Sequence, residues 1–349
     1  MRGGLPLVLA LAAGALSALS CTSPRGWYFD DSGRAERSEL RDLFTLLDDP
    51  SIAGEERFAV IQAVSDSFRR RGEWTRLADF LQGLVEARPE DEYAAHHLMA
   101  IGHAYIELDD APIAELWFDR AVKNHPDLLV KGESVHLACL RKLIELADAP
   151  ERRLDYRRAV ISRFADRVDL GAELFLLGKD YEAIGDWAEA LDAYKRFIPK
   201  GESVVPGYPD AQRYARNLLD FSSSQKDWTF VRLDDLASRV RKALADGDPA
   251  ALRRLRARVG FFAMSWHQST ELGNAQKLFE FAEFMRGVKV QAAPDWDPSS
   301  NAREAFLRTS GWSDRISTWY LYFRKIDFPA DPDVHGQWEW AGIYFGERP

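Results

Sequence analysis

Apolar residues along the first two thirds of the chain recur at the three- and four-residue spacings of amphipathic helices. The clearest pattern has two such stretches joined by a polar corner, with small residues where the two would meet. Its positions are Leu98, Ile101, Gly102, Tyr105, Ala114, Phe118, Ala121 and Pro126. A glycine and an alanine let two helices approach closely, and a proline stops the second helix. The segment therefore predicts a pair of antiparallel helices.

Two other segments carry the same pattern. One contains Leu174, Leu177, Gly178, Tyr181, Ala190 and Tyr194, and the weaker one contains Ile61, Val64, Phe68, Leu77, Leu81, Leu84 and Pro89. The three copies start at Phe58, Ala95 and Gly171, and the second interval is close to double the first. We therefore expect a degenerate helix pair in residues 132–170.

These positions resemble the signature of the tetratricopeptide repeat, a helix–turn–helix unit of about 34 residues, although Leu98 stands where that signature has tryptophan. The resemblance implies a superhelix with an extended concave groove. In that family the first helix of each unit lines most of the groove. By this resemblance, the exposed positions expected to contact a partner are Asp66, Arg69, His96, Met99, His103, Glu173, Lys179 and Glu182.

The ends of the array can also be placed. Residues 38–47 form an amphipathic stretch that we expect to cover its N-terminal end. The corners Gly72-Glu73-Trp74 and Gly185-Asp186-Trp187 are echoed by Lys226-Asp227-Trp228, which suggests one more helix pair near 209–224 and 229–246.

The last third of the chain changes from helical to strand-like patterning. Residues 259–266, 317–323 and 337–345 are rich in aromatic and β-branched residues, and a helix is expected over 275–285. This predicts a smaller α+β domain. The segment Leu244–Leu252 resembles the start of nuclear-transport-factor-2-like domains, in which a curved sheet encloses a pocket.

Aromatic residues of this domain have two interpretations. They form ordinary sheet core, or Trp266, His267, Tyr320 and Trp340 surround a ligand pocket. In the second case, His267 with Asp295, Asp297 or Glu339 could act as an acid/base set. Residues 309–313 are expected to form a loop that connects strands.

Motifs of known chemistries do not occur in the sequence. It has no metal-ligand spacing, nucleophile elbow or phosphate-binding loop, so we expect no metal, no cofactor and no catalysis. The formal net charge of -9 argues against a nucleic-acid partner. With 349 residues, of which 46% are hydrophobic, the chain is expected to form at least two folded domains.

The N-terminus has the layout of a secretory signal peptide, with Arg2 before an apolar stretch that is too short to span a membrane. The junction Ala18-Leu19-Ser20-Cys21 resembles the processing box of bacterial lipoproteins, although Ala18 stands where leucine is usual. The resemblance implies that Cys21 is acylated and, because Thr22 follows it, that the protein faces the periplasm from the outer membrane. An ordinary signal peptide is the alternative. Cys139 would be the remaining thiol, and its apolar surroundings predict a buried rather than a reactive cysteine.

We therefore expect a mainly α protein, with a repeat superhelix followed by a smaller α+β domain. The expected divisions are a signal peptide at 1–20, a lipidated tether at 21–34, helical repeats at 35–229 and the α+β domain at 230–349. The leading hypothesis is a lipid-anchored periplasmic adaptor that binds a protein or peptide of the cell envelope. The alternative is a small-ligand binder or hydrolase that uses the C-terminal domain.

Overall fold

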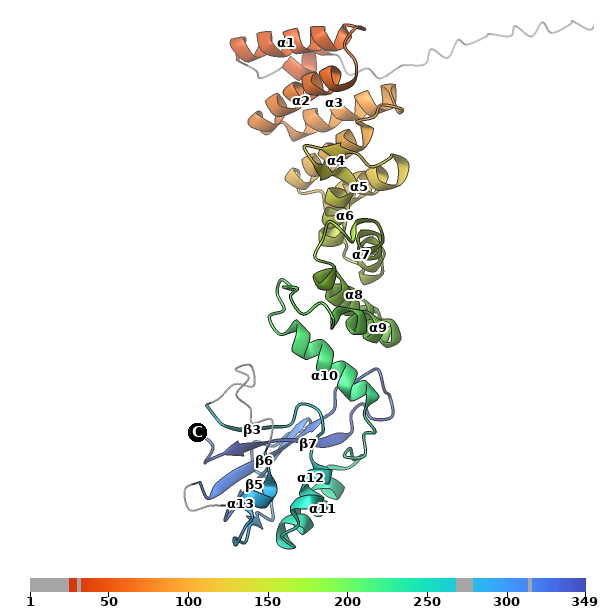
Figure 1. Cartoon of the computed structure of the whole chain (residues 1–349). Coiled ribbons are helices and arrows are strands. Elements are labelled where there is room, and N and C mark those ends of the chain that lie inside the picture. The colour runs from red at the N-terminus through yellow and green to blue at the C-terminus, as the bar shows by residue number, and fades with distance from the viewer. Residues whose placement is uncertain (1–24, 30–32, 268–278, 313–315) are drawn as a thin grey trace, which may run out of the picture. The chain divides into compact units, whose positions relative to one another are not determined.

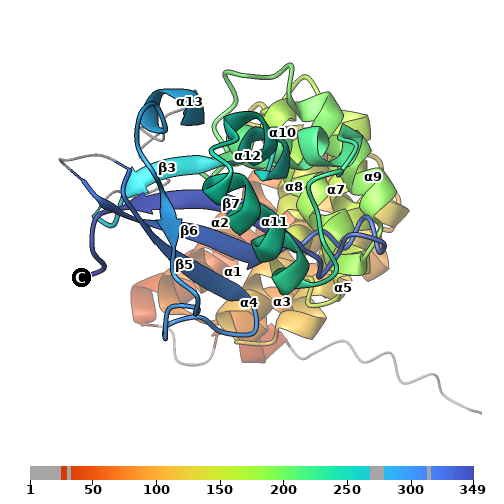
Figure 2. The ribbon, with the colours of Figure 1, turned by 90° about the horizontal axis from the view of Figure 1, so that it is seen from below.

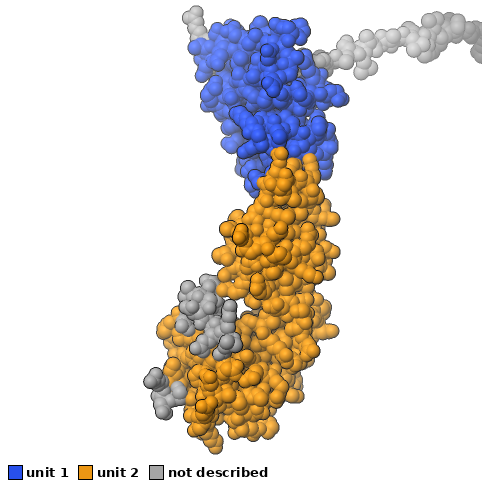
Figure 3. Space-filling view, viewed as in Figure 1, with its two compact units in different colours: residues 1–146 blue, residues 147–349 orange. Residues whose placement is uncertain are grey.

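The computed structural model describes residues 25–29, 33–267, 279–312 and 316–349. Residues 1–20 and Cys21, on which the signal-peptide and lipidation predictions depend, lie outside the described residues. The chain divides into two compact units, residues 1–146 and 147–349 (Figure 3). This division falls within the predicted repeat segment 35–229.

Unit 1 consists almost entirely of helices in which successive members pack together (Figure 1). Its elements are η1 (Arg25–Phe29), α1 (Arg34–Asp48), α2 (Gly54–Arg71), α3 (Trp74–Ala87), α4 (Ala94–Glu107), α5 (Ala111–Asn124), β1 (Leu129–Val130), β2 (Glu133–Ser134) and α6 (Val135–Leu146). The predicted pairs are confirmed as α2 with α3 and α4 with α5. Helix α1 contains the predicted amphipathic stretch 38–47 and buries Leu40 and Phe44.

Part of the expected tether is packed rather than free. Tyr28 of η1 is buried, and its ring stacks on Phe44 at 5.5 Å and meets the edge of Phe80 at 6.1 Å. Aromatic contacts of this kind stabilise a core beyond the area that they bury. Tyr28 of η1 therefore belongs to the core of unit 1.

A β-hairpin that the sequence pattern did not predict separates α5 from α6. The strands β1 and β2 pair Leu129 with Ser134 and Val130 with Glu133. The turn residues Lys131 and Gly132 both have positive φ, 53° and 86°, as a two-residue hairpin turn requires. The expected degenerate pair in 132–170 corresponds to two helices that belong to different units, α6 and α7 (Pro150–Phe164).

Unit 2 begins with four further helices and ends with an α+β fold. The helices are α7 (Pro150–Phe164), α8 (Leu170–Ile184), α9 (Trp187–Phe197) and α10 (Ala211–Ser223), and each packs against the next. The predicted copy that starts at Gly171 is confirmed as the pair α8 and α9. Helix α10 also matches the helix predicted near 209–224.

Small residues determine how closely the helices of a pair approach. A Cβ atom added to Gly102 of α4 would lie 2.8 Å from the Phe118 ring of α5, and one added to Gly178 of α8 would lie 2.4 Å from the Tyr194 ring of α9. Only glycine leaves room for these rings. The sequence-based reason for glycine at this position of both copies is therefore confirmed.

The corners between helices share a backbone conformation. Gly72 and Gly185 end their helices with φ of 69° and 80°, and Asp109 and Lys226 adopt φ of 58° and 59°. A left-handed residue ends a helix and turns the chain back. Lys226 lies beyond the end of α10, whose cap Ser224 is extended, and the chain then reaches Phe230, which pairs with Trp338 of the sheet. The predicted repeat corner at Lys226 is therefore wrong, although this residue has positive φ.

The described part of the α+β fold contains five strands and three helices. Its elements are α11 (Leu233–Ala245), α12 (Pro249–Leu255), β3 (Phe262–Ser265), α13 (Phe281–Phe284), β4 (Gln291–Ala292), β5 (Glu304–Ser310), β6 (Thr318–Lys325) and β7 (Trp338–Phe345). The strand order is β3-β7-β6-β5-β4, with β3 parallel to β7 and the other pairs antiparallel. Helices α11 and α12 cover one face of this sheet (Figure 2).

Three predictions for this region need correction. Helix α11 buries Leu236, Val240 and Leu244 in the sheet core, so it belongs to the α+β fold and does not close the repeat array. Strand β5 was missed because its apolar run is short and flanked by charged residues, and it includes Thr309 and Ser310, which were expected in a loop. The described part of the predicted helix 275–285 is helical only in α13.

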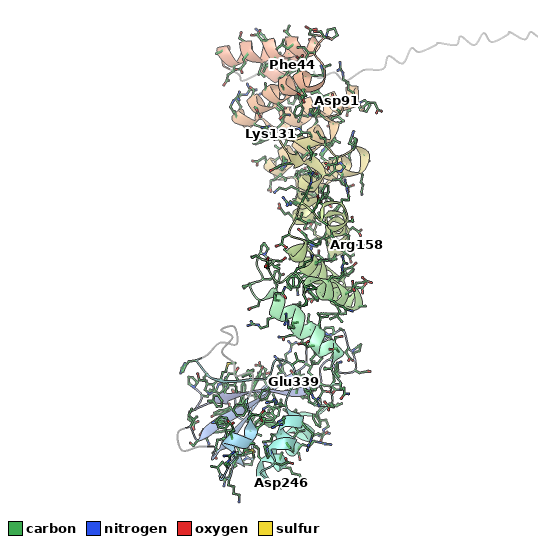
Figure 4. All side chains as sticks on the ribbon, in the orientation of Figure 1. Phe44, Asp91, Lys131, Arg158, Asp246 and Glu339 are labelled. Atoms are coloured by element: carbon green, nitrogen blue, oxygen red, sulfur yellow. The ribbon has the colours of Figure 1, made fainter. Side chains whose placement is uncertain are left out.

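A shared apolar cluster joins α10 to the α+β fold. Phe221, at the end of α10, packs with Trp228, Ile326, Phe328 and Val334. The buried Trp228 Nε1 donates a hydrogen bond of 3.1 Å to Glu339 Oε2 of β7, which Figure 4 places within the sheet. Unit 2 therefore contains both repeat helices and the sheet, because this cluster connects them.

The molecule is thus mainly α, with a helical repeat followed by a smaller α+β fold. Among the described residues, no helix has the length and apolar character that crossing a membrane requires.

Candidate partner-binding surfaces

The predicted groove residues of unit 1 lie on one side of its first helices. In α2, Arg69 forms an ion pair of 2.7 Å with Asp66. In α4, His96, Met99 and His103 follow one another at helical spacing. Arg69 is close enough to His96 and His103 for its charge to lower the pKa of both imidazoles. The structure therefore brings these five residues together.

His96 was predicted to be exposed like the other groove residues, but it is buried. Its side chain is only 9% exposed, whereas Asp66 and His103 are exposed and Met99 is half-buried. The reason is that the Phe58 ring of α2 lies 5.1 Å from the His96 ring and covers it.

Two lysines that the sequence analysis did not select extend this surface. Lys131, at the tip of the β1–β2 hairpin (Figure 4), contributes to the lowered pKa of His96. Lys142 of α6 similarly affects His103 and also pairs with Glu145 at 2.7 Å. We call Asp66, Arg69, His96, Met99, His103 and Lys131 the unit-1 face. A hairpin tip reaching this surface has no counterpart in the repeat pattern, and the dipeptide Lys131-Gly132 was its only signal.

The predicted groove residues of unit 2 are engaged in packing and are not free. The Glu182 carboxylate accepts hydrogen bonds from Tyr194 Oη at 2.6 Å and Tyr214 Oη at 2.8 Å, and it pairs with Lys179 Nζ at 2.5 Å. Burial, followed by this hydrogen bond, raises the pKa of Tyr194. These groups connect α8, α9 and α10, so reversing the charge of Lys179 would disturb folding as well as any partner contact.

Glu173 also has a structural contact. Its carboxylate pairs with Arg157 Nη1 of α7 at 2.7 Å, and Arg157 Nε pairs with Asp180 Oδ2 at 2.6 Å. Arg153 adds a further contact of 2.8 Å to Asp180 Oδ1. Arg157 and Asp180 are both buried. This network holds α7 against α8, and the four-residue spacing of the two arginines was the signal that could have indicated it.

Exposed apolar residues in unit 2 offer a different surface. Tyr214 of α10 is 36% exposed, and Tyr208 and Val204 in the preceding loop are 40% and 79% exposed. The Tyr208 and Tyr214 rings lie 5.1 and 6.0 Å from Phe175 of α8. Partly exposed aromatic rings held by packing are typical anchors for a protein partner. These residues were not predicted from the sequence because they lie outside the predicted copies.

The four residues of the predicted C-terminal pocket are not brought together. Trp266 and Tyr320 are 5.4 Å apart, but Trp340 is fully buried beneath the helices on the opposite face of the sheet. The strand pairing explains this, because Trp340 lies opposite Phe323, an odd number of positions from Tyr320. His267 follows β3 and is exposed.

The proposed acid/base partners of His267 have other contacts. Glu339 is buried between Trp228 and Arg324 Nε, which lies 2.9 Å from its Oε1. Asp297 accepts a hydrogen bond from the Ser299 hydroxyl, which lowers the pKa of Asp297, and Asp295 is exposed. Among the described residues, therefore, no acid/base set is assembled around His267.

The helix-covered face of the sheet is a filled core. Trp312 stacks on Trp319 at 4.2 Å, and Trp312 Nε1 donates to Thr309 Oγ1 at 2.7 Å. Phe281 packs against Trp340 at 5.3 Å. On this face the aromatic residues form ordinary sheet core, which is the first of their two interpretations from the sequence.

Within the described part of the chain, no cluster of His, Cys, Asp and Glu side chains could hold a metal ion. Cys139 is buried in α6, and burial raises the pKa of its thiol to about 12. A thiol in such surroundings is unreactive, as expected.

A shallow cavity of about 610 Å³ opens at the other end of the α2–α4 contact. Its lining includes Gly54 and Arg57 of α2, the loop residues Arg88 and Asp91, and Tyr93 before α4. The buried Arg57 donates through Nη1 to Leu47 O at 2.9 Å. The cavity is therefore lined by a buried arginine of α2 and by acidic residues of the loop before α4.

No protein-family model matches this chain, and no curated protein sequence matches it. Among solved structures, a crystal structure of MamA is similar over 45% of this chain and 83% of that chain, with 16% sequence identity and a TM-score of 0.31. So weak a similarity carries no argument about function, and the repeat fold is established by the packing of its own helices.

Proposed function

We propose that this protein is a lipid-anchored periplasmic adaptor that binds a protein or peptide partner in envelope assembly or transport. The observation that supports binding most directly is the unit-1 face, where side chains from α2, α4 and the β1–β2 hairpin gather without forming a closed core. Helical repeats commonly use such surfaces to hold partners. The proposed role is binding without catalysis.

The proposed anchor and location rest on the sequence around Cys21. Two or more acyl chains would hold the protein stably at a membrane, because each buried methylene adds about 0.8 kcal/mol of membrane affinity. Growth with a labelled fatty acid tests this proposal. We expect label on the native chain and none on Cys21→Ser, whereas label on both chains would refute attachment at Cys21.

Partner capture from detergent-solubilised envelopes tests the binding surface. Arg69→Glu with Lys131→Glu reverses two charges on the unit-1 face, and Lys123→Glu reverses a lysine on α5 whose side chain is 66% exposed. We expect the double variant to lose a partner that the Lys123 control retains, with both chains folded by circular dichroism. Equal capture by all chains would refute the role of this face.

Unit 2 provides a separate test of the same function. Tyr208→Ala removes a partly exposed ring that packs on Phe175 but does not belong to the Glu182 network, so it should lower stability without unfolding unit 2, which circular dichroism checks. Loss of capture in this variant alone would place the partner on unit 2.

A second proposal, of small-ligand binding by the C-terminal fold, concerns the sheet face opposite the helices. There Trp266 stacks on Tyr344 at 4.2 Å, and the Arg348 guanidinium lies 5.3 Å from the Trp266 ring centre. The nuclear-transport-factor-2-like resemblance belongs to this proposal. Tryptophan fluorescence during a ligand screen tests it, and a response that survives Trp266→Phe would refute it.

A further inference from the structure

Two consecutive histidines of α4 are buried where this helix contacts α2. His96 is 9% exposed and His97 is 1% exposed. The ring of Phe58 from α2 lies 5.1 Å from His96 and 6.0 Å from His97, and Tyr93 stacks on Phe58 at 4.1 Å. The two imidazoles, which we call the histidine pair, are therefore part of the contact that joins the two helices.

The histidine pair has few hydrogen-bond partners. Among the described residues, none bonds to Nδ1 of His96 or to either ring nitrogen of His97, and all three atoms are buried. A neutral imidazole can be buried in this way at moderate cost, whereas an imidazolium without partners is far less favourable. The site therefore accepts the rings only while they are neutral.

The charged groups around the pair also oppose proton uptake. His96 faces His97 and His103 in α4, Arg69 in α2 and Lys131 in the hairpin, and each of these disfavours a positive charge on it. His97 faces Arg57 in α2, which opposes protonation, and Asp91 in the preceding loop, which favours it. Burial is the largest cause, and together these effects lower the pKa of both imidazoles from 6.5 to about 4.

Water can approach this contact through the shallow cavity described above. Arg57 and Asp91, the charged neighbours of His97, both line it, and so does Tyr93. A small opening between α2 and the loop would therefore expose His97 to solvent, so that a proton could bind to the open form.

We propose that the histidine pair is an acid-sensitive switch, which holds α4 against α2 while neutral and releases α4 when it takes up protons. Its effect on a partner rests on the proposed function, because His96 belongs to the unit-1 face. The opening itself does not depend on any partner.

The direction in which pH changes the stability of the closed form follows from the linkage between proton binding and opening. Because the lowered pKa belongs to the closed form, the open form binds protons first, and the closed form has its full stability above about pH 6.5. That stability is lost as the pH falls from about 6.5 to about 4. Each proton taken up only by the open form raises the opening constant about tenfold per pH unit, so the pair gives at most about a hundredfold per unit.

Hydrogen exchange on the full chain measures this opening. Exchange of α4 amides, corrected for the intrinsic effect of pH, should give an opening constant that rises at least tenfold per unit between pH 6 and pH 4.5. His97→Phe removes one of the two protonation sites, so the rise in the opening constant per pH unit should be about ten times smaller than in the native chain. His267→Gln removes an exposed histidine from unit 2 and should leave it unchanged.

A second variant and a titration of the native chain keep the proposal testable if His97→Phe does not fold. His97→Gln should flatten the dependence as His97→Phe does, and an NMR titration of the native chain should show two histidines that stay neutral down to about pH 5. Opening in the native chain that does not change with pH, or imidazoles that all titrate near 6.5, would overturn the switch. Partner loss in the Arg69→Glu and Lys131→Glu chain tests the proposed function separately, since it needs no acidification.

Discussion

Replacement of Gly102 by alanine tests the reason for glycine in the repeats. The new Cβ atom would lie 2.8 to 2.9 Å from three carbons of the Phe118 ring, closer than carbon atoms pack. Phe118 is fully buried, and the centre of the His103 ring lies 5.1 Å from the centre of its ring, so the ring has little freedom to move. The clash must therefore separate α4 from α5 or distort the ring.

Two effects of opposite sign determine the size of the change. Alanine in a helix interior is favoured over glycine by about 1 kcal/mol. Overpacking a well-filled core costs about 1–3 kcal/mol, and a rigid ring places this site near the upper end. We therefore expect Gly102→Ala to lower the free energy of unfolding by about 2 kcal/mol, the overpacking cost near its upper end less the propensity gain.

A matched control separates these effects. Gly83 lies in α3, is exposed, and has nothing within 4 Å of an added Cβ atom. Gly83→Ala should therefore raise the free energy of unfolding by about 1 kcal/mol, the helix-propensity gain alone. In the Gly102→Ala chain, a further Phe118→Leu change should restore part of the lost stability, because leucine leaves room for the methyl group.

Urea unfolding followed by far-ultraviolet circular dichroism measures these differences. The slope of the transition must stay constant for the comparison to hold. If Gly102→Ala stabilised the protein as much as Gly83→Ala does, the close approach of α4 and α5 would not be the reason for glycine at this position.

Three other contacts give predictions of known direction. Trp228→Phe removes the hydrogen bond to Glu339 and should cost about 1–3 kcal/mol, seen as a lower Tm, and an unchanged Tm would contradict the joint between α10 and the sheet. Asp180→Asn removes one of the two carboxylates that pair with the buried Arg157 and should cost about 3 kcal/mol in urea unfolding, against less than about 1 kcal/mol for Asp192→Asn in an exposed pair. In a Cys21→Ser chain, Cys139 should react with a thiol reagent only after unfolding, and rapid labelling of the folded chain would contradict its burial.

Local pattern was sufficient to predict the helix pairs. The spacing of Leu98, Gly102, Ala114 and Phe118 depends only on helix geometry and on contact between two neighbouring helices, so it can be read along the chain. The corners at Gly72 and Gly185 were predictable for the same reason, since a left-handed residue at a helix end is a local feature.

The exposure of individual polar residues was not predictable in this way. Lys179 and Glu182 looked like solvent-facing residues of a first helix, yet they contact Tyr214, which comes from a helix more than thirty positions later in the chain. His96 was expected on the surface but lies beneath Phe58. Each outcome depends on which side chains other helices bring to the same place.

The sequence by itself determined the repeat pairs, their corners and the change to an α+β fold, because these follow from periodicity over a few turns of chain. The tertiary structure decided that α11 packs beneath the sheet, that Trp266 and Trp340 lie on opposite faces, and that a histidine pair closes the α2–α4 contact. Strand register and helix docking fix those outcomes, and both depend on contacts between residues far apart in the chain.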